Sequence, residues 1–233
     1  MISGYINSIQ SLGGSDGPGV RFVVFLQGCN LNCGCCHNPE TRDAGGTKLS
    51  AEEIANKAAR YREYFGEMGG ITLSGGEPLL QPLFAREVFS LCKEAGINTC
   101  LDTSGSVWNE DVASLLEVTD FVLLDIKYTN DEQYRLHAGC DMERVLRFLS
   151  ELERRQIPTV LRQVIIPTLN DNEQNVLRLK ALAEKHSCVQ KVELLPFKKI
   201  CQSKYDELGK VFPFGNLPTP TSVDMARLNS LLK

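Results

Sequence analysis

The densest group of reactive side chains in this sequence is a short loop with four cysteines, Cys29, Cys33, Cys35 and Cys36. The first, second and fourth of them follow the spacing C-x3-C-x2-C. Thiolates are the usual ligands of iron–sulfur clusters. Three ligands on a cluster of four irons leave one iron open, and an open position distinguishes a catalytic metal site from a structural one. The spacing therefore predicts a [4Fe-4S] cluster that is held by Cys29, Cys33 and Cys36.

Other cysteine sites fit this loop less well. A structural zinc site needs four ligands, usually in two separated pairs, and no second pair with such spacing follows. The segment Cys33–His37 also fits the C-x-x-C-H pattern of c-type haem attachment, but that attachment belongs to exported proteins. Cys35 could serve as a fourth ligand and make the cluster an inert electron carrier. We expect instead that Cys35 and Cys36, which are adjacent in the chain, do not both bind irons of one cubic cluster.

The composition is that of an ordinary globular protein. Of 233 residues, 42% are hydrophobic and 23% are charged, and the net charge of −4 gives no sign of a nucleic-acid footprint. No apolar run approaches the roughly 18 residues of a membrane helix, and Met1–Gly14 lacks the pattern of a signal peptide. We therefore expect a cytoplasmic location, where disulfides are rare. Cys92, Cys100 and Cys188 are then expected to be small core residues.

Six short apolar runs are predicted to form the strands that position the cysteine loop. Val, Ile, Leu and Phe dominate them with little polar alternation, which is typical of strands buried on both faces. The expected strands are Val20–Gln27, Gly70–Leu73, Asn98–Leu101, Phe121–Asp125, Thr159–Ile166 and Lys191–Leu195.

Helical patterns separate these strands. Ser50 and Glu53 form a capping-box pattern, which predicts a helix from Ser50 to about Phe65. Alternating strands and helices imply a parallel sheet with right-handed crossovers. Since a closed barrel needs eight such units, six predict an α/β fold, an incomplete (β/α)6 barrel, as a single domain over residues 1–233. The other expected helices are Phe84–Ala95, Glu110–Leu116, Met142–Arg155, Glu173–Lys185 and one after Ser222.

Polar or glycine-rich segments follow several of the expected strands. In barrel enzymes, the carboxyl ends of the strands carry the active site. Each segment could also be a tight turn, a helix cap or a surface ion pair, so no segment is decisive by itself. The candidates are Gly75, Gly76 and Glu77 in the sequence Ser74–Pro78, then Asp102 and Thr103, then Asp125 and Lys127, and finally Lys198.

Together, and in this order, the cysteine loop and these segments resemble the radical S-adenosylmethionine superfamily. The closest group is the glycyl-radical-enzyme activases, in particular those of pyruvate formate-lyase, and the likeness runs from Ser15 to about Leu208. The resemblance implies an incomplete barrel of the radical S-adenosylmethionine type. It also implies that the open iron binds S-adenosylmethionine and that reductive cleavage gives a 5′-deoxyadenosyl radical. The protein supplies positioning and exclusion of solvent, and the cofactor supplies the chemistry.

The resemblance also implies roles for individual residues. The segment with Gly75, Gly76 and Glu77 lies along the methionine part of the cofactor, and Lys127 can pair with its carboxylate. Cys35 stands where an aromatic residue usually packs beside the adenine, and Lys198 stands where these activases normally have a histidine close to the cofactor. A monovalent-cation site, for Na⁺ or K⁺, is implied for Asp102, Asp125 and the carbonyls of Thr103 and Leu123.

The implied partner is a glycyl-radical enzyme, with flavodoxin or ferredoxin as the reductant. Many activases carry further cysteine clusters after the first motif, but none occurs here between Asn38 and Ser50, which favours pyruvate formate-lyase. The segment Ser15–Arg21 would lie near the opening that admits the partner's glycine loop. The alternatives are another glycyl-radical enzyme as partner, a small-molecule radical enzyme such as a deazapurine-forming synthase, and an electron carrier.

Overall fold

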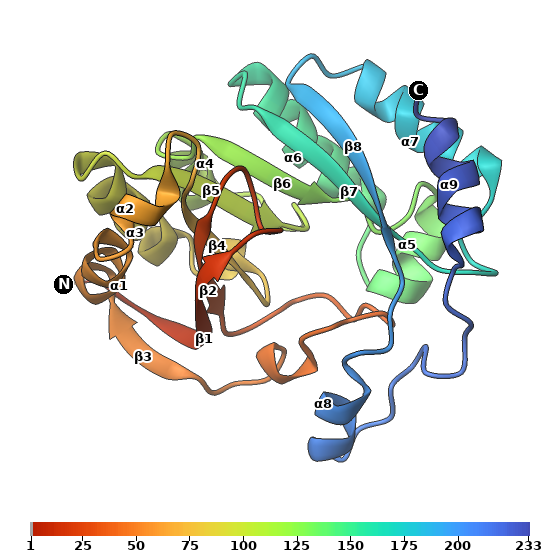
Figure 1. Cartoon of the computed structure of the whole chain (residues 1–233), viewed down its shortest axis with the longest axis horizontal. Helices are drawn as coiled ribbons and strands as arrows, with labels where there is room; N and C mark the ends of the chain where they lie inside the picture. Colours follow the sequence, from red (N-terminus) through yellow and green to blue (C-terminus); the bar gives the residue numbers. More distant parts are fainter. Residues whose placement is uncertain (1) are drawn as a thin grey trace. The chain divides into compact units, whose positions relative to one another are not determined.

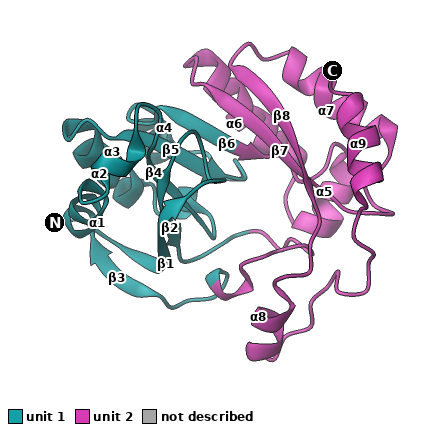
Figure 2. Cartoon of the chain, in the orientation of Figure 1, with its two compact units in different colours: residues 1–30, 41–123 teal, residues 31–40, 124–233 magenta. Residues whose placement is uncertain are grey.

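The computed structural model of the chain describes residues 2–233 (Figure 1). The chain divides into two compact units, residues 1–30 with 41–123 and residues 31–40 with 124–233 (Figure 2). The boundary passes through the cysteine loop, because Cys29 belongs to unit 1 whereas Cys33, Cys35 and Cys36 belong to unit 2.

The strands include all six that the sequence predicts, with small shifts at their ends. Two further strands, β1 and β3, precede the first expected helix. The strands are β1 (Ser3–Gly13), β2 (Arg21–Leu26), β3 (Thr47–Ser50), β4 (Gly70–Gly75), β5 (Asn98–Thr103), β6 (Phe121–Asp125), β7 (Thr159–Ile165) and β8 (Val189–Pro196).

In unit 1 the strand order is β3-β1-β2-β4-β5. The neighbours β2, β4 and β5 are parallel, as expected, whereas β1 runs antiparallel to both β2 and β3. The start of β1 alternates, with Ser3 and Tyr5 exposed and Gly4 and Ile6 buried, which is typical of a strand with one solvated face. The expectation of six strands was therefore incomplete, because continuous apolar runs identify only strands buried on both faces.

A helix is present in each of the five predicted ranges, and the last expected helix begins at Ser222. The capping box is confirmed, since the Ser50 side chain accepts from Glu53 N and the Glu53 side chain accepts from Ser50 N. The helix it begins ends at Ala59 rather than near Phe65, and a separate turn follows at Arg62. The helices are α1 (Ala51–Ala59), α2 (Arg62–Phe65), α3 (Pro82–Glu94), α4 (Glu110–Leu116), α5 (Asp131–Ala138), α6 (Met142–Arg154), α7 (Glu173–Glu184), α8 (Gln202–Glu207) and α9 (Ser222–Ser230), with the 3₁₀ turns η1 (Pro39–Thr41) and η2 (Pro78–Leu80).

Unit 2 contains the parallel pair β7 and β8, with α6, α7 and α9 around it (Figure 1). Helix α6 buries Val145, Phe148, Leu149 and Leu152, a spacing that places them on one helical face. The segment Val211–Thr221, which holds three prolines, has neither helix nor strand. Among the residues that the structure describes, no helix combines the length and the apolar composition needed to cross a membrane.

Arg21, which the sequence placed at the opening for the partner, lies fully buried at the start of β2. Its guanidinium donates to Thr72 Oγ1 at 3.0 Å, to Asn98 Oδ1 at 2.8 Å and to the backbone carbonyls of residues 18, 68, 71 and 98. Burial lowers the pKa of Arg21. The expectation that Arg21 contacts a partner is therefore wrong, since the side chain fastens the loop before β2 to β4 and β5.

We expect Arg21→Lys to lower the free energy of unfolding by about 3 kcal/mol, because a lysine cannot reproduce the planar set of donors. Several buried carbonyls would then lose their hydrogen bonds. The measurement is urea unfolding. The exposed Arg60 offers a matched control, and Arg60→Lys is expected to change stability by less than about 0.5 kcal/mol. Equal effects of the two substitutions would contradict a structural role for Arg21.

Candidate active site

In unit 2 the cysteine loop is held by the carboxyl end of α5. Asn32 N donates to the carbonyl of Ala138 at 2.8 Å, and Gly34 N donates to the carbonyl of His137 at 3.1 Å. The last carbonyls of a helix have no partner within the helix, so the loop satisfies them while the helix fixes the loop. Within the loop, Cys36 N donates to the carbonyl of Cys33 at 3.3 Å. The backbone around Cys33 and Cys36 is therefore fixed by hydrogen bonds.

Contacts from α8 and from the end of β8 hold the end of the cysteine loop, Cys36, His37 and Asn38. Tyr205 donates its hydroxyl to the carbonyl of Cys36 at 3.3 Å, and Lys204 donates to Asn38 Oδ1 at 2.9 Å. His37 Nε2 lies 2.9 Å from the carbonyl oxygen of Lys198. The Lys198 backbone thus contacts the cysteine loop, whereas the Lys198 side chain is exposed, and its predicted contact with the cofactor stays a prediction. Tyr205 and Lys204 were missed because α8 was not expected.

Cys33 and Cys35 are half-buried thiols with a cation nearby. Burial raises the pKa of Cys33 to about 12 and that of Cys35 to about 11, and the charge of Lys127 acts in the opposite direction. Iron binds the thiolate, so ligand deprotonation and metal binding are coupled. Lys127 therefore lies where it favours the metal-binding form of these cysteines.

Lys127 belongs to a triad of charges at the end of β6. Asp125 Oδ2 accepts from Lys127 Nζ at 2.8 Å, and Asp125 Oδ1 accepts from Arg162 Nε at 2.9 Å. Burial alone would raise the pKa of Asp125, but the charges of Arg162 and Lys127 outweigh it and lower the pKa to about 2. Burial likewise tends to lower the pKa of Lys127, but Asp125 raises it well above its usual value. All three groups are thus ionised near neutral pH.

In unit 1 the glycine-rich segment lies directly against the chain that leads to Cys29. Gly76 N donates to the carbonyl of Leu26 at 2.9 Å, and Glu77 N donates to the carbonyl of Gly28 at 2.8 Å. A Cβ atom at residue 76 would lie 2.0 Å from the Gly28 carbonyl oxygen, and Gly75 has a φ of +105°. Only glycines permit this close approach. The segment therefore fixes the position of the residue that precedes Cys29.

The Glu77 side chain holds a second loop to this segment. It is 1% exposed and accepts from Leu79 N at 3.1 Å, from Thr103 Oγ1 at 2.5 Å, and from both the amide and the hydroxyl of Ser104. The network continues from Ser104 through the Ser106 hydroxyl to Asn30, the residue after Cys29. The Glu77 carboxylate thus serves as a hydrogen-bond acceptor within the fold. Contact of the segment Gly75–Glu77 with the cofactor remains a prediction.

The remaining candidates lie at the ends of β5 and β6. Ser74 donates its hydroxyl to Asp102 Oδ2 at 2.8 Å, and Leu123 is buried. Asp102, Thr103 and Leu123 belong to unit 1, whereas Asp125 belongs to unit 2. Each carboxylate oxygen of Asp125 already accepts from one cationic side chain, and a bound Na⁺ or K⁺ would have to share an oxygen with that partner. The monovalent-cation site therefore stays a prediction.

The cysteine set fits an iron–sulfur cluster. All nine cysteines are free thiols, so no disulfide competes for the loop, and Cys92, Cys100 and Cys188 are buried as expected. Among residues 2–233, no three His, Cys, Asp or Glu side chains converge to hold a single metal ion. A four-iron cluster does not need such convergence, because each thiolate binds a different iron. Cys29 also lines a cavity of about 970 Å³ in unit 1, together with Gln27, Gly46 and Leu80.

Comparison with known proteins gives a consistent result. Residues 23–179 match the family model described as the Radical SAM superfamily. The chain is 40% identical over 235 residues to the pyruvate formate-lyase-activating enzyme of Clostridium pasteurianum, which covers the whole chain and 98% of that protein. It is 36% identical over 236 residues to the pyruvate formate-lyase 1-activating enzyme of Escherichia coli K12, which covers the whole chain and 96% of that protein.

Solved structures show the same fold at low sequence identity. SuiB from Streptococcus suis, bound to the precursor peptide SuiA, has a TM-score of 0.72 at 14% identity, over 95% of this chain and 46% of that one. A domain of a pyruvate-formate lyase-activating enzyme from Bacteroides vulgatus has a TM-score of 0.59 at 21% identity, over 70% of this chain and 92% of that one. These similarities, with the family match, confirm the expected fold class.

Proposed function

Because the chain belongs to the radical S-adenosylmethionine superfamily, we propose that it is the activase of a glycyl-radical enzyme, most specifically of pyruvate formate-lyase. The observation that carries this proposal is the identity of 36–40% over the full chain to proteins named as activating enzymes of pyruvate formate-lyase. Family membership implies a [4Fe-4S] cluster and S-adenosylmethionine as cofactors.

A cluster held by Cys29, Cys33 and Cys36 would supply one electron for the reductive cleavage of the S–C5′ bond of S-adenosylmethionine. The deoxyadenosyl group would take a hydrogen atom from the backbone carbon of a glycine in the partner, so the products would be methionine, 5′-deoxyadenosine and a glycyl radical. The electron comes from reduced flavodoxin or ferredoxin.

The residues of this chain hold and orient the reactants. Cys29, Cys33 and Cys36 would bind three irons and leave the fourth open. The segment Gly75–Glu77 would face the methionine part of the cofactor, in a position that the Glu77 carboxylate fixes through its bonds to Thr103 and Ser104. Lys127, which lies near the cysteine loop and is ionised, would pair with the cofactor carboxylate, and Lys198 is a further candidate for contact.

The proposal extends to the organisation and location of the protein. The two units would act as a single domain, since the family match at residues 23–179 runs through both of them. A cytoplasmic location is supported by the nine free thiols, which are typical of a reducing compartment. The segment at Asp16 remains a candidate contact for the partner, because Asp16 is partly exposed.

Glycyl-radical formation tests the function directly. The reduced protein is mixed under anaerobic conditions with S-adenosylmethionine and pyruvate formate-lyase, and the radical is measured by electron paramagnetic resonance. We expect the glycyl-radical signal and about one 5′-deoxyadenosine per radical. The matched control is a partner in which the target glycine is replaced by alanine, and it should give no such signal.

The alternatives give different outcomes in the same experiment. A radical on another glycyl-radical enzyme, but not on pyruvate formate-lyase, would correct the partner alone. Cofactor cleavage with consumption of a small metabolite, and no protein radical, would favour a small-molecule radical enzyme. A reduced cluster without any cofactor cleavage would indicate an electron carrier.

A further inference from the structure

The short helix α8 is flanked by exposed apolar side chains that the proposed mechanism does not use. Ile200 is 75% exposed, Leu208 is 40% exposed and Val211 is 87% exposed. They lie just before and just after the helix, in a part of unit 2 that lies apart from β7 and β8 (Figure 1). Large apolar side chains that are exposed as a group often mark a surface for another protein.

Backbone hydrogen bonds fix the turn that follows α8. Lys210 N donates to the carbonyl of Tyr205 at 2.9 Å, and Gly209 N donates to the carbonyl of Asp206 at 3.0 Å. Gly209 has a φ of +62°, so these bonds form the Schellman motif that commonly ends a helix. The exposed Val211 side chain therefore belongs to an ordered turn.

The aromatic residues between these exposed side chains pack into unit 2. Tyr205 is 2% exposed and stacks on Phe212, with ring centroids 4.7 Å apart. Phe212 in turn lies 6.0 Å from the Phe197 ring. Tyr205 also donates its hydroxyl to the carbonyl of Cys36. The exposed surface is thus connected to the cysteine loop through one packed aromatic side chain.

The same segment is basic, in contrast to the chain as a whole. Residues 198–212 include four lysines and two carboxylates, whereas the whole chain has a net charge of −4. One of these lysines, Lys204, forms an ion pair with Glu40. The half-buried Lys199 precedes α8, and the exposed Lys210 follows it. An acidic protein surface would therefore be attracted to this part of unit 2.

We propose that the α8 surface, defined as Lys199, Ile200, Leu208, Lys210 and Val211, is the docking site of the reductant, an electron-carrier protein with an acidic surface around its redox group. In the docked complex the carrier gives up one electron, which reduces the cluster, and the two proteins then separate. Weak electron-transfer encounters bury less than about 1,200 Å², so a small surface is enough. This inference rests on the cluster and the reductant of the proposed function, and it adds the place where the reductant binds.

The test measures the rate at which reduced flavodoxin reduces the cluster of the holoprotein, by anaerobic stopped-flow absorbance. We expect Lys210→Glu to lower the second-order rate constant about tenfold at low ionic strength, because steering by opposite charges raises association rates by at least that factor. The loss should shrink at about 1 M salt, where the Debye length is about 3 Å. Reduction by photoreduced deazaflavin, a small molecule that needs no docking surface, should stay unchanged.

Lys185→Glu is the matched control for charge. Lys185 is also an exposed lysine of unit 2, but it precedes β8, whereas the α8 surface follows that strand. The eight residues of β8 separate the two places by about 26 Å. We expect Lys185→Glu to change the rate constant by less than about twofold. Equal losses in the two variants would show an effect of net charge and overturn the proposal, as would an unchanged rate in Lys210→Glu.

Val211→Ser tests the apolar part of the surface. It should weaken the binding of oxidised flavodoxin to the holoprotein about fivefold, as measured by titration calorimetry, because less apolar area is buried. Since salt does not screen this contact, the effect should be the same at low and high ionic strength. The matched control is Val223→Ser, because Val223 is 74% exposed on α9. Equal binding by the two variants would contradict docking at Val211.

The other protein that could occupy this surface is the glycyl-radical enzyme. If Lys210→Glu keeps the rate of reduction by flavodoxin but forms less glycyl radical with deazaflavin as reductant, then the surface binds that enzyme and the proposal is wrong. If flavodoxin does not reduce the wild type, reduced ferredoxin replaces it, and failure of both carriers would also overturn the proposal.

Failure of the proposed function gives a different result. A wild-type holoprotein that deazaflavin reduces, but that forms no 5′-deoxyadenosine from S-adenosylmethionine, would refute the proposed function. The docking site would still stand if reduction by flavodoxin depends on Lys210.

Discussion

Replacement of Cys29, Cys33 or Cys36 by alanine is expected to abolish cluster binding and S-adenosylmethionine cleavage. Even the loss of groups that only orient a metal ligand costs about 10- to 100-fold in metal affinity or activity, so the loss of a ligand should reduce cleavage by more than about 100-fold. We expect Cys35→Ala to keep both the cluster and the cleavage activity. The measurements are iron and sulfide content after anaerobic reconstitution, and 5′-deoxyadenosine formed by the reduced protein.

Cys92→Ala provides a control for the loss of a thiol elsewhere. Cys92 is buried in α3 of unit 1, away from the cysteine loop along the chain. Cys92→Ala should lower stability slightly and leave the iron content unchanged. If Cys35→Ala loses its cluster while Cys36→Ala retains one, then the ligand set is wrong and the spacing of the loop has been misassigned.

The sequence predicts the parallel part of the fold well because its strands are continuous apolar runs. The elements that it misses have other patterns. Strand β1 alternates between exposed and buried side chains, and α5 buries only Tyr134 and Ala138. Helix α8 has six residues and buries only Tyr205. These elements depend on contacts with distant parts of the chain, which no local pattern reveals.

Residue type and position after a strand identify candidate residues for the site, but they do not show what each side chain contacts. Glu77 and Arg21 both lie in motifs that suggest contact with a ligand or a partner. In the structure they are buried and hydrogen-bonded to their own unit. Distinguishing such roles requires the tertiary contacts.

The second large effect is expected on stability, when Asp125 is removed from its triad with Arg162 and Lys127. We expect Asp125→Ala to lower the free energy of unfolding by about 3 kcal/mol, because removal of one partner leaves the charges of Arg162 and Lys127 uncompensated in a partly buried place. Asp141 provides the matched control. It also contacts two arginines, Arg135 at 3.0 Å and Arg144 at 3.7 Å.

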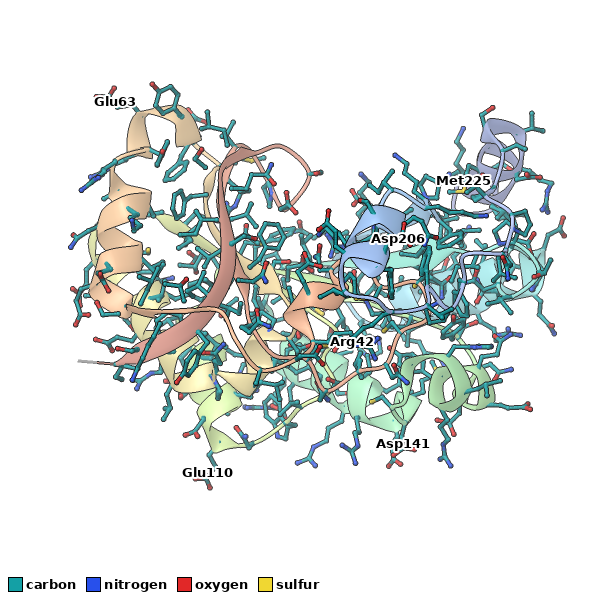
Figure 3. All side chains as sticks on the ribbon, turned by 90° about the horizontal axis from the view of Figure 1, so that it is seen from below. Arg42, Glu63, Glu110, Asp141, Asp206 and Met225 are labelled. Atoms are coloured by element: carbon teal, nitrogen blue, oxygen red, sulfur yellow. The ribbon has the colours of Figure 1, made fainter. Side chains whose placement is uncertain are left out.

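The two aspartates differ mainly in exposure. The side chain of Asp125 is 23% exposed and that of Asp141 is 43% exposed, and Asp141 lies at the outer surface of unit 2 (Figure 3). Exposed ion pairs contribute about 0–1 kcal/mol, so Asp141→Ala should cost less than about 1 kcal/mol. Comparable losses in the two variants would show that burial does not strengthen the Asp125 triad. Urea unfolding of the cluster-free protein measures the free energy of unfolding of both variants without a contribution from iron.

The pH dependence provides an independent check of the same triad. The pKa of Asp125 falls from an ordinary 3.8 to about 2 in the folded chain. Its contribution, about 2 kcal/mol by linkage, is therefore fully present above about pH 5 and is lost as the pH falls toward 2. Asp125→Asn keeps the shape but has no carboxylate to titrate. The difference in unfolding free energy between the wild type and Asp125→Asn should therefore be constant above about pH 5 and shrink between pH 4 and 2. A difference that does not change over that range would mean that Asp125 is not held ionised by Arg162 and Lys127.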